Sequence, residues 1–159
     1  MTQTVRDADA YILFELANTT YAIRSGDVQH MEMVEHITPV PNAPAHVEGV
    51  VFSRGQVVPA VNLRLRFGFP RAPYTLRSRL IVVQVEERRV GLIVDAAREF
   101  RNISADTIRA PNESITGLSG QYLAGIANIG DRVVLLLNIP EVIKSGVEVS
   151  SAEPALAEN

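Results

Sequence analysis

"GVVFSRGQVVPAVNL", residues 49–63, and "GIANIGDRVVLLLNI", residues 125–139, are the two stretches that decide the fold. In each, a glycine (Gly49, Gly125) precedes an asparagine by 13 residues, and Leu or Ile follows that asparagine. A repeated spacing of this kind indicates a repeated structural unit, so we predict two related β subdomains of about 65 residues each. Aligning the turn glycines pairs Gly55 with Gly130 and therefore Arg54 with Ile129.

The rest of the chain extends this β pattern. Runs rich in Val, Ile and Leu, separated by short polar turns, are typical of buried strands and hairpins. The predicted strand pairs are residues 11–16 with 21–23, 78–85 with 89–95, and 122–129 with 132–139. Small sheets hide their edges by closing, so we expect an all-β fold of barrels.

Helical signals are weak and short. Residues 61–68 are compatible with a single turn that ends at Gly68, and residues 140–144 with one turn that has Pro140 at its first position. Residues 25–35 begin with helix-capping residue types, but their later part fits a strand equally well. We expect flexible ends at residues 1–9 and 145–159, because both are polar and the second is rich in small and acidic residues.

Composition narrows the functional class. The net charge is −3, so a general attraction to nucleic acid or to anionic membranes is not expected. The chain has no Cys, no secretory signal pattern and no apolar run long enough to cross a bilayer. These features are compatible with a cytoplasmic location and predict no membrane insertion.

Motifs for catalysis or cofactor binding are missing from the sequence. There is no nucleophile elbow, Walker loop, dinucleotide fingerprint or paired-histidine zinc motif. His30, His36 and His46 have spacings that fit no common metal site, so we predict neither a metal nor a cofactor. We interpret Arg64 and Arg66 as solvated charges. Arg54 precedes a turn glycine between apolar residues, where a rigid hairpin could present its guanidinium as a bidentate donor.

Residues 10–144 resemble the CheW family of bacterial chemotaxis coupling proteins. The matching pieces are "ITPVPNAPAHVEGVVFSRGQVVPAVNLRLRFG" (37–68), "VGLIVDAAREFRNIS" (90–104) and "YLAGIANIGDRVVLLLNI" (122–139). They contain a Pro-rich link, Gly-Val, an Arg-Gly turn, a Pro-containing strand that ends in Asn-Leu-Arg, and a later Gly-hydrophobic-hydrophobic-Val-Asp, in the order of the family pattern.

The resemblance implies a fold, a function and sites. The fold would be two intertwined five-stranded SH3-like barrels, roughly residues 10–70 and 78–140, with strands open to exchange. The function would be that of a non-enzymatic adaptor between a CheA-type histidine kinase and methyl-accepting chemoreceptors, in arrays at the membrane. Ile12, Val28 and Met31 would form the kinase-facing apolar patch. A receptor-facing groove between the barrels would include Arg54, with Gly49 and Gly91 shaping the backbone nearby.

Two departures from the family pattern lie near these surfaces. The family usually has Asn-Leu before Arg-Gly, where this chain has Phe52–Ser53, and often has an acidic residue where this chain has His30. They leave open an adaptor of another chemosensory pathway, such as twitching motility or development. A small ligand-binding barrel or an enzyme is the third and weaker alternative.

Overall fold

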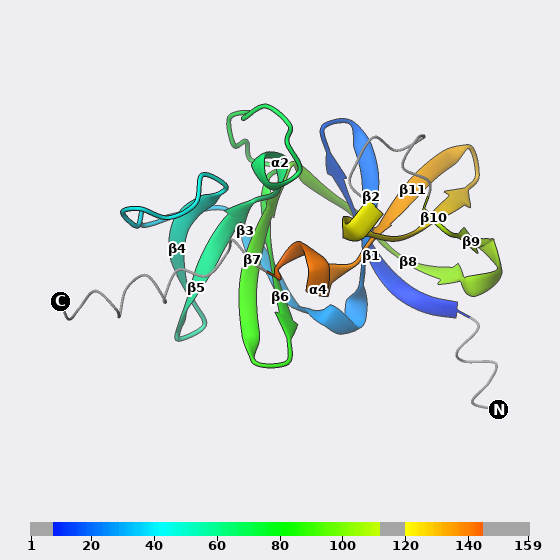
Figure 1. The fold of residues 1–159 in the computed structure, drawn as a ribbon, viewed down its shortest axis with the longest axis horizontal. Coiled ribbons are helices and arrows are strands. Elements are labelled where there is room, and N and C mark those ends of the chain that lie inside the picture. The colour runs from blue at the N-terminus through cyan, green and yellow to red at the C-terminus, as the bar shows by residue number, and fades with distance from the viewer. Residues whose placement is uncertain (1–7, 112–119, 145–159) are drawn as a thin grey trace.

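The computed structural model describes residues 8–111 and 120–144, and within them the chain folds into two curved β-sheets (Figure 1). The first sheet has the strand order β8 (Ala96–Ser104), β1 (Ala8–Leu16), β2 (Thr19–Arg24), β11 (Arg132–Leu137), β10 (Leu123–Ile129) and β9 (Ile108–Arg109). The second sheet has the order β3 (Val28–Met33), β6 (Arg79–Val85), β7 (Arg88–Val94), β5 (Gln56–Asn62) and β4 (Val47–Ser53). The predicted all-β class is confirmed, although β9, only two residues long, gives the first sheet a sixth strand.

Each sheet combines strands from both halves of the sequence. Neighbouring antiparallel hairpins are joined by a parallel pair, which in the first sheet aligns Thr20 of β2 with Val134 of β11. In the second sheet the parallel pair aligns Ala60 of β5 with Gly91 of β7. The subdomains are therefore intertwined, because the β1–β2 hairpin completes the sheet that contains β10 and β11.

Each sheet also curls so that its two edges approach. Strands β8 and β9 lie at opposite edges of the first sheet, yet only the 3-10 turn Ala105–Thr107 separates them along the chain. At the second sheet, Thr38 follows edge strand β3 by five residues and makes an isolated bridge to Val50 on the other edge strand, β4. The bridge has two backbone hydrogen bonds, of 2.9 and 2.8 Å. Curling leaves little unpaired strand edge.

The described residues bury three apolar clusters. One lies inside each curled sheet, around Leu13 and Val134 in the first and around Val58 and Leu80 in the second. The largest lies between the sheets and includes Phe14 and Tyr21, whose rings stack with centroids 5.7 Å apart. Full burial of one such side chain contributes about 1.5–3 kcal/mol, so the contact between the sheets is a main source of stability.

Two short helices cap this central cluster. The predicted turns are present as α2 (Leu63–Arg66) and α4 (Ile139–Val142), and α4 lies between the sheets in Figure 1. The side chains of Asn62 and Asn138 accept the amide hydrogen bonds that begin these helices, which explains why the repeat retains asparagine. Pro140 is the second helical residue, not the first as predicted.

The undecided segment after β2 is mostly a strand. Residues Ser25–Asp27 form one 3-10 turn, and β3 follows immediately, so the strand interpretation of the later part is right. In the part of the chain that the structure describes, no helix has the length and apolar character needed to cross a bilayer. The predicted flexible ends lie outside the described residues, except for residues 8 and 9, which belong to β1.

Candidate functional site

The β4–β5 hairpin carries the most unusual backbone among the candidate residues. Arg54 and Gly55 form its two-residue turn, with φ of 49° and 82°. A left-handed conformation costs a residue other than glycine about 1–2 kcal/mol, so an arginine is locally disfavoured here. Other non-glycine turn residues, among them Ala17 and Glu86, adopt the same conformation, so it is the exposed position of Arg54 that makes its side chain a candidate for contact with a partner.

Strand pairing corrects the predicted alignment of the two turns. In the β4–β5 hairpin Ser53 pairs with Gln56, and in the β10–β11 hairpin Ile129 pairs with Arg132. Both turns therefore have two residues, and the counterpart of Arg54 is Gly130, at φ 65°, not Ile129. Likewise Gly55 corresponds to Asp131 instead of Gly130. The prediction aligned Gly55 with Gly130, and this shifted the correspondence between the two turns by one residue.

An exposed apolar pair flanks the Arg54 turn. Phe52 is 75% exposed and Val57 is 65% exposed, and they are direct cross-strand partners. Large apolar side chains so exposed and adjacent are typical of a contact surface. The tip of this hairpin therefore presents an aromatic ring, an aliphatic side chain and a cation together.

On the strand position next to Phe52, Ser53 enters a polar cluster with β3. Ser53 is 4% exposed, and its hydroxyl donates to Oε2 of Glu32. Nε2 of His30 lies 2.6 Å from the same Oε2 and 2.9 Å from Oγ of Ser53. The cluster joins β3 to β4, the two edge strands of the second sheet.

The cluster lacks the arrangement of a serine–histidine–carboxylate triad. In a triad the two ring nitrogens contact different partners, whereas here Nε2 of His30 faces both Ser53 and Glu32. The buried Ser53 hydroxyl is also poorly placed to meet a substrate. The hydrogen bond from Ser53 lowers the pKa of the Glu32 carboxyl, burial opposes this, and His30 and Arg54 lower it further. Glu32 is thus held as a carboxylate.

The two glycines of the predicted receptor site do not adjoin Arg54. Gly49 pairs with Ala60, which pairs with Gly91, so both glycines lie in one row across the second sheet. Arg54 lies five residues farther along, which is about 17 Å of extended strand. Both glycines are buried: the backbone of Thr38 and Pro39 lies close to Gly49, and the side chain of Leu80 lies close to Gly91. Their role in the structure is therefore close packing.

The predicted kinase-facing residues lie on both sheets. Val28 packs against the cluster between the sheets, and Met31, 39% exposed, is also on β3. Ile12 is half-buried on β1, between Ile23 and Phe100 in the strand pairing. Strand pairing alone does not bring the three together into one patch.

Phe100, opposite Ile12, is a surface residue that the sequence reasoning missed. It is 66% exposed on β8. Its sequence context, "REFRN", places it between charged residues, and an aromatic residue in such a charged strand could have indicated an exposed position.

Arg64 and Arg66 are not solvated charges, contrary to the prediction. Nε and Nη2 of Arg64 donate to the two carboxylate oxygens of Asp95 at 2.9 and 2.8 Å, and Asp95 also accepts the amide of Ala17. Arg66 donates to the carbonyl of Val142 in α4 and lies over the ring of Tyr122, 5.5 Å from its centroid. Both arginines link segments that are distant in sequence.

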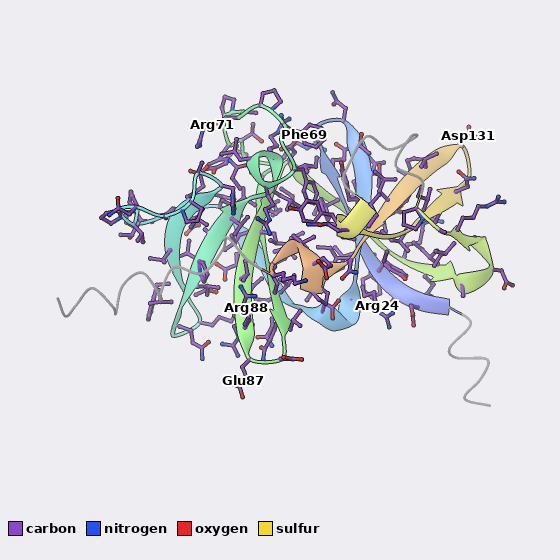
Figure 2. All side chains as sticks on the ribbon, viewed as in Figure 1. Arg24, Phe69, Arg71, Glu87, Arg88 and Asp131 are labelled. Atoms are coloured by element: carbon purple, nitrogen blue, oxygen red, sulfur yellow. The ribbon has the colours of Figure 1, made fainter. Side chains whose placement is uncertain are left out.

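The Arg64–Asp95 pair also lines a cavity of about 640 Å³, together with Glu15, Asn18 and the loop of residues 72–78. Burial raises the pKa of Asp95, but the hydrogen bonds from Arg64 and the Ala17 amide outweigh it and hold that pKa below its usual value. Arg54, Gly49 and Gly91 are not among the lining residues. Figure 2 labels Arg71, in the loop between α2 and β6. It also labels Arg88, which donates a hydrogen bond to the carbonyl of Lys144 after α4.

The described residues contain no group of three side chains suited to hold a metal ion. Two interlocked curled sheets that leave Phe52, Val57 and Arg54 exposed on one hairpin are typical of a protein-interaction domain. Comparison with known proteins gives the family. The CheW-like domain model matches residues 10–147. The chain belongs to the CheW family.

Individual relatives agree with this assignment. The chain is 30% identical over 149 residues to the chemotaxis protein CheW of Klebsiella aerogenes, covering 94% of this chain and 86% of that protein. It is 23% identical over 143 residues to protein FrzA of Myxococcus xanthus, covering 88% of each. The crystal structure of the scaffolding protein TtCheW from Thermoanaerobacter tengcongensis superposes with a TM-score of 0.80 at 27% identity, covering 89% of this chain and 91% of that one. The family is one of scaffolds and adaptors in chemotaxis signalling.

Proposed function

We propose that this chain is a non-enzymatic adaptor that couples a CheA-type histidine kinase to methyl-accepting chemoreceptors, in the cytoplasm at membrane receptor arrays. The observation that carries the proposal is the match of residues 10–147 to the CheW-like domain, in a chain that presents Arg54 exposed at the tip of the β4–β5 hairpin. Both proposed partners are proteins and not nucleic acids, and the adaptor function requires no cofactor. We propose that the domain spans residues 10–144, within the 10–147 range of the family match.

The two partners would use different faces. The receptor-binding group is Arg54, and Gly49 and Gly91 support it by keeping the second sheet tightly packed. The kinase-binding residues are Ile12, Val28 and Met31, which contribute apolar area. Weak contacts of this kind gain strength by avidity when they repeat in an array.

The test is binding of the full chain to a kinase regulatory domain and to a receptor cytoplasmic fragment, both from the same genome, by titration calorimetry. Arg54→Ala is expected to weaken receptor binding about tenfold or more without lowering the melting temperature. Arg77→Ala is the matched control, because Arg77 is also exposed but lies on the loop between the halves. If neither fragment binds at tens of micromolar, the adaptor proposal is wrong.

A CheW-like adaptor of another chemosensory pathway is the second candidate. The exposed Phe52, at a position where the family usually has asparagine, favours it, because a changed contact surface suits a changed partner. Binding to receptor fragments from each chemosensory system of the host separates the two candidates.

A further inference from the structure

Residues 70–78 connect α2 to β6, and the structure describes all of them as part of no helix or strand. This segment is called the strap below. Most of its residues line the cavity of about 640 Å³, together with Glu15 and Asp95. A second cavity, of about 310 Å³, is lined by residues 71–74 of the same segment. The strap therefore borders unfilled space at two places, and close packing is not what holds it.

One carboxylate oxygen holds the strap against the second sheet. Oε2 of Glu48, on β4, accepts a hydrogen bond from the hydroxyl of Tyr74 at 2.5 Å and another from Nη1 of Arg71 at 2.7 Å. The same oxygen accepts from Nδ2 of Asn62 at 2.8 Å, and Oδ1 of Asn62 caps α2. Glu48, Arg71 and Tyr74 are called the clasp below. The clasp fixes the strap to β4 and to the start of α2.

The protonation states of the clasp favour these hydrogen bonds. Burial raises the pKa of the Glu48 carboxyl, but the hydrogen bonds that it accepts outweigh burial and lower that pKa. Burial and the nearby Glu48 carboxylate raise the pKa of Tyr74, so its phenol keeps its proton and remains a donor. Hydrogen bonds to an ionised acceptor are stronger than those between neutral groups. The side chain of Arg71 is 58% exposed, so solvent weakens its contact and Tyr74 is the stronger anchor.

Two further contacts secure the ends of the strap. At its start, Nη1 of Arg64 donates to the carbonyl of Pro70 at 3.3 Å, while the rest of that guanidinium binds Asp95. At its end, the amide of Thr75 donates to Oγ of the buried Ser78 at 2.8 Å. Lifting the strap would break the clasp and the Pro70 contact but no strand pairing. Such local opening requires much less free energy than unfolding of the whole domain.

We propose that residues 70–78 are a strap latched over the cavity, and that the clasp controls whether this cavity is closed or open. Ala96 lines the cavity and is only 3% exposed, so the cavity walls shield it from solvent. With the clasp formed, the strap is one of these walls. With the clasp broken, the strap lifts, and the cavity can admit a small molecule or a side chain of a partner. The inference does not rest on the proposed roles in receptor or kinase binding.

The test measures how fast an aromatic disulfide reagent labels a single thiol in the full chain. The chain has no Cys, so Ala96→Cys introduces the only thiol, at the cavity. Adding Tyr74→Phe, which removes one hydroxyl, should speed labelling about tenfold, because the rate follows the population of the open state. Adding Arg71→Gln should speed it about threefold, since that contact is more exposed. Tyr122→Phe removes a hydroxyl outside the strap and should leave the rate unchanged.

A second thiol position separates strap opening from general loss of stability. Ala127→Cys is the matched control, because Ala127 is also a buried alanine, at 0% exposure, but lies inside the first sheet. Its labelling should not respond to Tyr74→Phe. If Ala96→Cys does not fold, Ser78→Cys serves as the reporter, since Ser78 is 4% exposed and lines the same cavity. Equal acceleration at both thiol positions, or no acceleration at the cavity in Tyr74→Phe, overturns the proposal.

Discussion

Replacing Gly49 by alanine should damage the closure of the second sheet. A Cβ atom at this position would lie 2.1 Å from the carbonyl oxygen of Thr38 and 2.9 Å from Cα of Pro39, and φ is +148°. An alanine held in this backbone conformation is destabilised by about 1–3 kcal/mol. The Thr38–Val50 bridge must also open, and its two hydrogen bonds contribute about 1 kcal/mol each. Together these effects predict a loss of about 3–5 kcal/mol in the free energy of unfolding, a large part of the usual 5–15 kcal/mol.

Urea unfolding of a glycine series measures this effect. Gly26→Ala is the control, because nothing lies within 4 Å of the added carbon and φ is not positive. Gly125→Ala is intermediate, since its Cβ meets a movable methyl of Ile108 at 2.6 Å and the carbonyl of Arg109 at 3.2 Å. We expect about 1–2 kcal/mol there. A Gly49→Ala chain as stable as Gly26→Ala would refute the argument from close approach.

Three further predictions follow from the same contacts. Arg54→Gly should raise the free energy of unfolding by about 1 kcal/mol, because glycine accepts the left-handed turn, yet weaken receptor binding; a lower melting temperature contradicts this. Asn62→Ala should cost more than Asn138→Ala, which loses a cap of about 1 kcal/mol, because Asn62 also donates to Glu48 at 2.8 Å; equal urea midpoints contradict this. Glu48 and Asp95 have lowered pKa values in the folded chain, so their stabilisation is present above the unfolded values and is lost as pH falls through the folded ones. Thermal melts should show stability declining below about pH 4.5, and a stability unchanged down to pH 3 would contradict this.

The local parts of the fold were predictable because local patterns determine them. Alternating apolar residues and short turns define the hairpins, and the asparagines of the repeat mark both helical turns. The contacts of the candidate site were harder to predict from the sequence. The pairing of Arg64 with Asp95 spans 31 residues, and no pattern around either residue indicates the other. The alignment of Arg54 with Ile129 failed because turn position, and not glycine identity, sets the correspondence.

The cluster of His30, Glu32 and Ser53 could not be predicted from the sequence either. His30 and Ser53 stand out from the family pattern separately, and no motif in the sequence marks Glu32 as their shared partner. Only the curling of the second sheet, which brings β3 to β4, places the three side chains together.

The parallel pairing of β2 with β11 has a consequence for synthesis on the ribosome. Thr20 is translated more than 100 residues before its partner Val134. The first sheet cannot be completed until β11 has been translated, so the apolar face of the β1–β2 hairpin must wait for it. Contacts so distant in sequence slow folding and leave unpaired strands exposed to aggregation.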